Sequence, residues 1–237
     1  TESCCVFFIP RSYACPTHVA PNRARRLDSG RTAILAYGCS MLKRLLARTF
    51  WAFSRWTLVS EAAPTRPTVL VGAPHTSNWD FVLMLAIAWR LDIDVHWLGK
   101  KSLFRGWRGP IMRRLGGIPV DRSDPARVVN DVVGQVHAGT VFGLVVTPDG
   151  TRGGNEYWKS GFYRIARETG MPVTLGFVDR TTMTSGLGPT IDLTGDVGAD
   201  MDRIRAFYAD KAGVRPERRT GPRLREELPA TTEPDAT

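Results

Sequence analysis

Segments that look like buried strands alternate with segments of helical periodicity along most of this chain. The strand candidates are short, largely apolar and bounded by turn residues, and they cover residues 68–72, 95–98, 117–120, 141–147 and 172–178. Apolar residues recur at helical spacing over residues 79–90, 125–137 and 161–169. Because parallel strands need crossover connections, this alternation favours a parallel sheet. We therefore predict an α/β fold, with a single domain over residues 63–215 and a mostly parallel central sheet flanked by helices.

An amphipathic segment precedes the predicted domain, over residues 41–62. Its apolar side chains at helical spacing are Leu42, Leu45, Leu46, Phe50, Phe53 and Trp56. Lys43, Arg44, Arg48 and Arg55 supply positive charge, and no acidic residue interrupts residues 41–59. Such a helix either packs on the sheet or lies in a membrane interface with its basic side on anionic headgroups. We predict the second, an amphipathic interfacial helix that makes peripheral membrane contact.

The two ends of the chain lack periodicity. Residues 1–40 are rich in Arg, Pro, Ser and Cys and are expected to form a poorly ordered N-terminal arm, with a capping or partner-binding arm as the alternative. All four cysteines lie there, so we expect neither a disulfide scaffold nor a cysteine metal site in the domain, and a reducing cytosolic compartment. Residues 216–237, rich in Arg, Glu, Pro and Thr, are expected to be a disordered tail.

The charge balance restricts the partners. The formal net charge of +9 and the pI of about 9.9 favour anionic partners, such as nucleic acid, anionic lipid headgroups or phosphorylated substrates. The best apolar helix candidate, residues 81–89, is about half as long as the roughly 20 residues that cross a bilayer. We therefore expect no transmembrane helix and a peripheral position at the cytoplasmic face of a membrane.

Polar residues follow the first predicted strand, where an α/β sheet gathers its ligands. His75 and Asp80 are five residues apart, and in a regular helix they would lie about 140° apart. They can meet if His75 is in the loop and Asp80 is in the first turn of the helix. A carboxylate on one ring nitrogen would fix the tautomer, leaving the other nitrogen to take a proton from a hydroxyl. The plainer alternative is a structural histidine beside a helix cap.

Two further loops carry arginines that suit a phosphate. Arg122 follows one predicted strand and Arg152 follows another, and a guanidinium offers two parallel donors to a phosphate. Gly150 lets backbone amides approach an anion. Taken singly, each arginine fits a surface salt bridge and 149–150 fits a plain turn. The chain has no G-x-S-x-G pattern, which favours direct attack by a substrate hydroxyl over a covalent acyl-enzyme.

Four short motifs stand in order along the chain: P-H-T-S-N-W-D at 74–80, G-G-I-P-V-D-R at 116–122, T-P-D-G-T-R-G at 147–153 and M-P-V at 171–173. In order and spacing they resemble the glycerolipid acyltransferase family, whose best-known members are the 1-acylglycerol-3-phosphate acyltransferases. The corresponding family motifs are N-H-x4-D, G-x-I-x-x-x-R, F-P-E-G-T-R-S and a stretch around V-P-V. The K-S-G at 159–161 is also similar to a family K-x-G stretch.

The resemblance implies an activity and a set of site residues. The activity is O-acyl transfer from acyl-CoA or acyl carrier protein to a lysophosphatidate-like acceptor, with His75 as the base and Asp80 orienting it. Arg122 would hold the acceptor's phosphate. The loop Asp149, Gly150, Thr151 and Arg152 would bind and align the acceptor. Lys100, at the start of a basic stretch, is a further substrate-binding candidate. The chemistry expels a thiolate and requires no metal or cofactor.

Some positions depart from the family pattern. Pro74 replaces Asn, Asp149 replaces Glu, Gly153 stands where Ser is common, and the fourth motif lacks its second proline. These departures motivate an alternative acceptor, another lipid or glycolipid alcohol. A different alternative is a basic nucleic-acid-binding module, because residues 105–114 mix arginines with a tryptophan. No recognised nucleic-acid motif frames them, and we predict no nucleic-acid partner.

Overall fold

The structure, a computed structural model, describes residues 29–121, 123–139, 142–150 and 155–228, with the side chains of the first helix described from Met41 onward. The chain divides into two units between Ser40 and Met41. The described part of the smaller unit, residues 29–40, is helical. It is the start of α1 (Ser29–Phe53), which continues into the larger unit.

The larger unit is built on a seven-stranded sheet, as far as the described residues go. Its strands are β1 (Thr57–Leu58), β2 (Thr68–Ala73), β3 (Val95–Lys100), β4 (Gly117–Val120), β5 (Gly143–Val146), β6 (Val173–Asp179) and β7 (Thr184–Ile191). Their order is β1-β7-β6-β2-β5-β3-β4. All neighbours pair in parallel except β6 and β7, which are antiparallel. The predicted α/β fold with a mostly parallel sheet is confirmed.

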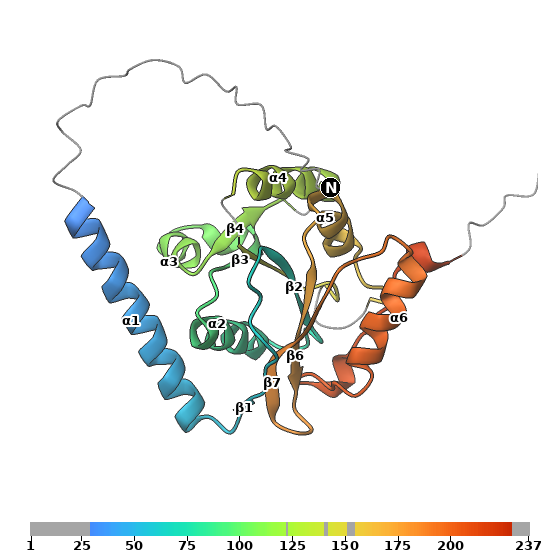
Figure 1. Cartoon of the computed structure of the whole chain (residues 1–237), viewed down its shortest axis with the longest axis horizontal. Coiled ribbons are helices and arrows are strands. Elements are labelled where there is room, and N and C mark those ends of the chain that lie inside the picture. Colours follow the sequence, from blue (N-terminus) through green and yellow to red (C-terminus); the bar gives the residue numbers. More distant parts are fainter. Residues whose placement is uncertain (1–28, 122, 140–141, 151–154, 229–237) are drawn as a thin grey trace, which may run out of the picture. The chain divides into compact units, whose positions relative to one another are not determined.

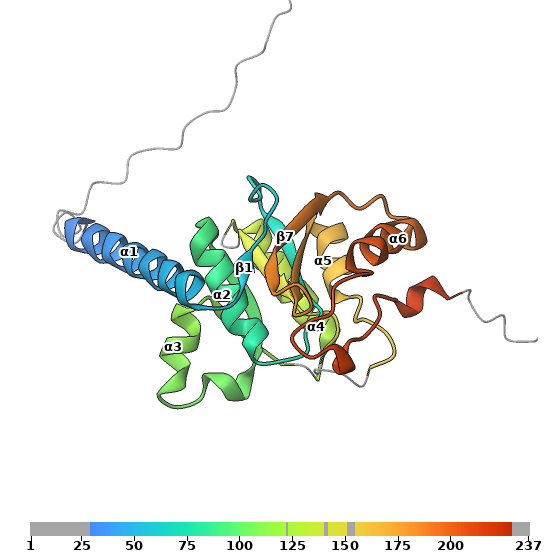
Figure 2. The same cartoon turned by 90° about the horizontal axis from the view of Figure 1, so that it is seen from below.

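Helices cover both faces of this sheet. They are α2 (Trp79–Leu91), α3 (Arg108–Arg114), α4 (Pro125–His137), α5 (Gly161–Thr169) and α6 (Val197–Tyr208), with short 3-10 turns η2 (Lys101–Phe104), η3 (Pro216–Arg218) and η4 (Arg225–Glu227). Both views show α2 and α3 on one side of the sheet and α5 and α6 on the other (Figures 1 and 2).

Successive residues of the central strand face opposite cores, as strand geometry requires. Val69 and Val71 of β2 pack in a cluster with residues of α4, α5 and α6, whereas Leu70 packs in a second cluster with α2 and β3. Because β2 is buried on both faces, its side chains are almost uniformly apolar, which is typical of a parallel sheet.

The N-terminal helix differs in extent from the predicted one over 41–62. It begins at Ser29, inside the segment expected to be a poorly ordered arm; residues 1–28 lie outside the described residues. Residues 29–40 contain alanine and leucine, which are good helix formers, and extending an existing helix costs little. The helix ends at Phe53, because Thr57 and Leu58 pair with β7 at the sheet edge.

The apolar residues of α1 divide between two sides rather than forming one membrane-facing side. Ala47 is buried, and the Trp51 indole N–H donates to the Ala86 carbonyl oxygen of α2 at 3.1 Å. Phe50 packs with Leu83. The exposed side chains are Met41, Leu42, Leu45, Leu46 and Phe53, of which Phe53 is 87% exposed. One part of the helix therefore packs on the core, and the other part leaves apolar side chains exposed.

The C-terminal residues 216–228 are packed, so the prediction of a disordered tail from 216 is wrong for them. Leu224 is 1% exposed. Trp158 donates its main-chain N–H to the Arg223 carbonyl at 2.7 Å and its indole N–H to the Thr220 carbonyl at 3.3 Å. Glu227 forms an ion pair with Arg205 of α6. Burial alternates over Thr220, Pro222 and Leu224, but only Leu224 of these is strongly apolar, so the sequence shows no hydrophobic periodicity here. Residues 229–237 lie outside the described residues.

The length and hydropathy of the helices bear on membrane insertion. Within the described parts of the chain, none of them is long and apolar enough to cross a bilayer.

Candidate active site

Two loops meet at the carboxyl edge of the sheet because β2 and β5 are parallel neighbours. Their register pairs Val71 with Val146, so the loop after β2 and the loop after β5 leave the sheet side by side. His75 lies in the first loop and Asp149 in the second. The topology thus brings together residues that the sequence places 74 positions apart.

His75 and Asp80 form the geometry that their spacing predicted. His75 is in the loop and Asp80 is in the first turn of α2, with Nδ1 of the imidazole 3.2 Å from Oδ2 of the carboxylate. The same Oδ2 accepts the main-chain N–H groups of Thr76 at 2.7 Å and Ser77 at 2.8 Å. These bonds fix the carboxylate, so Nδ1 is directed to it and Nε2 is left for another partner. Their catalytic parts in the reaction stay predictions.

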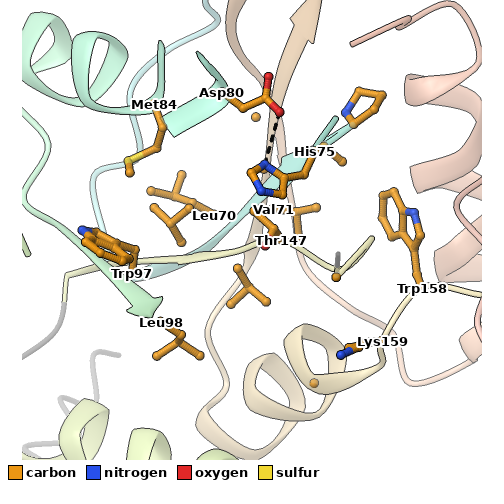
Figure 3. A pocket seen from close by; sticks show the side chains of 18 of the residues that line it. Leu70, Val71, His75, Asp80, Met84, Trp97, Leu98, Thr147, Trp158 and Lys159 are labelled. Carbon is orange, nitrogen blue, oxygen red and sulfur yellow. Dashed lines mark ion pairs between the residues drawn. The ribbon is translucent and has the colours of Figure 1, made fainter. Parts of the chain in front are cut away.

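A cavity of about 970 Å³ runs past His75. One side of it is apolar and includes Leu70, Met84 and Trp97, with further lining by Ile87 and Val95. The lining away from this side includes Lys159, with Trp158 beside it, and the further polar side chains that line the cavity are Asn155, Tyr157, Arg164, Arg225 and Glu226. Figure 3 shows His75 between these sides, with Met84, Trp97 and Leu98 in one direction and Trp158 and Lys159 in the other.

The carboxylate of Asp149 lies behind His75, away from the cavity lining. Its side chain is 0% exposed, and Oδ2 accepts the His75 main-chain N–H at 3.0 Å. Oδ1 is buried, with no hydrogen-bond partner among the described residues. Burial raises the pKa of the Asp149 carboxyl to about 6, although the bond from the His75 N–H opposes this effect. The adjacent Gly150 does line the cavity, with a left-handed φ of 76°.

The other predicted substrate-binding residues are placed less directly. Lys100 is exposed at the end of β3, and it is the neighbouring Gly99 that lines the cavity. Arg122, Thr151 and Arg152 lie outside the described residues. Asn155, Tyr157 and Arg225 line the cavity without having been singled out from the sequence. Arg225 lies in the segment predicted as a tail, so no strand-end pattern pointed to it.

Metal-ligating side chains are not clustered in the part of the chain that the structure describes: no group of three or more His, Cys, Asp or Glu residues is placed to hold an ion.

Comparisons with known proteins agree with this fold. The family model described as Acyltransferase matches residues 57–174. The crystal structure of the 1-acyl-sn-glycerophosphate (LPA) acyltransferase PlsC from Thermotoga maritima is similar over 80% of this chain and 81% of that chain, with a TM-score of 0.53 and 17% sequence identity. At that identity the likeness establishes a shared fold. No curated protein sequence gives a match.

Proposed function

Because this chain belongs to the acyltransferase family, as its match over residues 57–174 shows, we propose that it is an O-acyltransferase acting on a lysophosphatidate-like glycerophospholipid. The acyl donor is a thioester, acyl-CoA or acyl carrier protein. The observation that carries the proposal is the His75–Asp80 pair, with 3.2 Å between Nδ1 and Oδ2, at the wall of a cavity with one apolar and one polar side. The Thermotoga protein, named for acylglycerophosphate acylation, supports the choice of acceptor.

The proposed reaction uses His75 as a general base. Nε2 takes the proton of the acceptor hydroxyl as that oxygen attacks the thioester carbonyl carbon. The tetrahedral intermediate collapses with cleavage of the carbon–sulfur bond, and the imidazolium returns the proton to the leaving thiolate. Asp80 holds Nδ1–H and stabilises the imidazolium while it exists. Two of its hydrogen bonds come from main-chain N–H groups, so the carboxylate is already oriented before substrate binds.

The two sides of the cavity suit the acyl chain of the donor and the headgroup of the acceptor. The apolar side, with Leu70, Met84 and Trp97, fits a fatty acyl chain, whose burial is favourable in proportion to its apolar area. The Trp97 indole N–H donates to the Leu115 carbonyl at 2.8 Å, so it does not leave an unpaired polar group facing the acyl chain. The polar side, near Lys159 and Arg225, faces the acceptor headgroup in this arrangement.

An acceptor panel tests the proposal directly. Purified protein is incubated with labelled acyl-CoA or acyl carrier protein and a set of lysolipids and glycolipid alcohols, and the products are identified by mass. We expect acylated lysophosphatidate or a close relative. Acylation of a glycolipid alcohol instead would favour the alternative acceptor suggested by Pro74 and Asp149, and transfer to none of them would contradict the proposal.

Replacing Arg122 or Arg152 with alanine is expected to weaken acceptor use. A hydrogen bond to a charged group is worth roughly 1.5–3 kcal/mol, so kcat/KM for the phosphorylated acceptor should fall about ten- to a hundredfold. The thioester's KM should change little. Steady-state kinetics with each substrate varied in turn measure both effects. Weaker binding of the donor alone would remove both arginines from the acceptor site.

The exposed part of α1 supports peripheral membrane contact, which we place at the cytoplasmic face. Its uncovered apolar side chains lie among Lys43 and Arg48, a combination that suits the interface of an anionic bilayer. A second exposed group consists of Leu103 on η2, Trp107 just before α3 and Ile111 on α3, in the stretch 100–120 that has no acidic residue. Leu103 also lines the cavity, so this surface adjoins the proposed site.

A triple substitution in α1, Leu42, Leu45 and Phe53 to Ser, is expected to abolish most binding to anionic vesicles, because it removes exposed apolar area that only the bilayer covers. Vesicle co-sedimentation over a salt series measures it, and wild-type binding should weaken with salt and on neutral vesicles. The matched control changes three exposed apolar residues elsewhere, Val59, Val82 and Leu228, to Ser. Equal loss of binding in both variants would show that α1 is not the contact.

A further inference from the structure

We infer that Asp149 is a positioning residue that anchors the main chain of His75 from inside the protein, rather than a ligand of the acceptor. The inference rests on the proposed function, because it assigns a part in that same reaction. It differs from the expectation, drawn from the family resemblance, that the Asp149 side chain helps to bind the acceptor.

Two buried carboxylates hold His75 from different directions. Asp80 Oδ2 faces the imidazole Nδ1, at 3.2 Å, and Asp149 Oδ2 accepts the main-chain N–H of the same residue at 3.0 Å. The first contact sets the rotation of the ring. The second fixes the backbone from which the ring projects. A base must lie within hydrogen-bond reach of its proton, so a displaced backbone would lower the rate even with Asp80 intact.

The main chain around Asp149 is itself held by hydrogen bonds within its own loop. The Asn155 side-chain amide donates to the Asp149 carbonyl at 2.6 Å, and the Gly150 N–H donates to the Thr147 carbonyl at 3.3 Å. Gly150 adopts φ of 76°, and a side chain at this position would collide with Asn155. The turn therefore directs the Asp149 side chain inward, toward β2, while Gly150 and Asn155 face the cavity.

The surroundings of Asp149 do not suit a phosphorylated ligand. The carboxylate is 0% exposed, whereas Gly150, Asn155 and Lys159 supply the cavity lining at this point. The nearby hydroxyl of Tyr208 is also buried. It lies 3.1 Å from the Val71 carbonyl and 2.8 Å from the Gly176 carbonyl, so it donates to the main chain of the sheet and not to Asp149. A negative carboxylate would also repel a phosphate. Its position favours interaction with a transient imidazolium instead.

The charge of Asp149 contributes to the effect as well as its hydrogen bond. The titratable groups that face it are His75 and Asp80 on one side, Tyr208 of α6, and Lys159, whose side chain reaches Gly150. Burial raises the pKa of the carboxyl to about 6, and the charge of Asp80 adds to this increase. At pH 7.5 the group is still mostly ionised, and its negative charge favours the protonated imidazole that forms as the acceptor hydroxyl is deprotonated.

Asp149→Ala and Asp149→Asn separate the hydrogen bond from the charge, because asparagine keeps an accepting oxygen and loses the charge. At pH 7.5 we expect kcat to fall about ten- to a hundredfold in the alanine variant and less in the asparagine variant. KM for the acceptor should change by less than about threefold in both, because neither substitution removes a contact with the bound acceptor. A raised acceptor KM with unchanged kcat would overturn the inference and return Asp149 to acceptor binding.

Amide hydrogen exchange, followed by NMR without any substrate, tests the anchor independently of turnover. The His75 amide should exchange at least about tenfold faster in Asp149→Ala and near the wild-type rate in Asp149→Asn, because only the first loses the accepting oxygen. The Thr76 and Ser77 amides, bonded to Asp80, are the internal controls and should not change.

The two measurements also separate the possible failures. Unchanged His75 exchange in the alanine variant would refute the anchor, whatever the enzyme acylates. Faster exchange in a protein that acylates none of the acceptors would contradict the proposed function and leave the anchor standing. If Asp149→Ala does not fold, Asp149→Leu, which is close to aspartate in shape but has no accepting oxygen, decides the matter: faster His75 exchange with a lowered kcat and unchanged acceptor KM supports the inference, and wild-type exchange overturns it.

Discussion

Replacing His75 with alanine is expected to lower kcat by about 10²–10⁴-fold while the protein remains folded. Loss of a positioned general base typically costs that much in rate. The side chain is partly exposed at the cavity wall, so its removal leaves little empty space in the core. Turnover of labelled thioester measures the effect, and thermal unfolding of the same samples checks the fold.

Asp80→Asn should be impaired to a similar degree, because an amide can hold the wrong tautomer of His75 and cannot stabilise imidazolium. The matched control is His137→Ala, which removes an exposed histidine at the end of α4 and should leave kcat unchanged. Near-normal turnover by folded His75→Ala and Asp80→Asn proteins would refute the assignment of the base.

Leu224→Ala is expected to destabilise the protein by about 2–5 kcal/mol, the usual cost of truncating a fully buried leucine. The substitution keeps the main-chain N–H that donates to Glu227, so the effect reports on packing. Denaturant unfolding, with the midpoint and slope both fitted, gives the change in the free energy of unfolding.

Leu228→Ala is the matched control for that prediction. Leu228 lies in the same segment but is 47% exposed, and its truncation should change stability by less than about 0.5 kcal/mol. If Leu224→Ala were as mild as Leu228→Ala, residues 216–228 would be the solvated tail that their composition suggested.

Periodicity predicted the parts of the fold in which neighbours along the chain share an environment. The helices expected at 125–137 and 161–169 have those bounds in the structure, and the strand expected at 117–120 is β4. The errors fall where contacts between residues far apart in the sequence determine the structure. Thr57 and Leu58 form β1 because β7 pairs with them, and Leu224 is buried in a core cluster that also contains residues of α5 and α6.

In the candidate site, too, contacts between residues close in sequence were predictable and contacts between distant residues were not. His75 and Asp80 are close in sequence, so a loop followed by a helix was enough to predict that they meet. The bond from the His75 N–H to Asp149 depends on the register of β2 against β5, and no local pattern carries that information. The sequence likewise showed that α1 is basic and apolar. It could not show which apolar side chains are buried, because Trp51 lies at the core and Phe53 in solvent only as a result of where α2 packs.

The place of β2 in the sheet has a consequence for synthesis on the ribosome. β2 ends at Ala73, but its two neighbours, β5 and β6, begin only at Gly143 and Val173. At about 5–20 residues per second, the chain needs roughly 5–20 s to extend from Ala73 to Val173. During that time the strand that carries the His75 loop has at least one unpaired edge. We therefore expect the nascent chain to remain inactive and a target for chaperones until most of the domain has been translated, even though the His75–Asp80 segment emerges early.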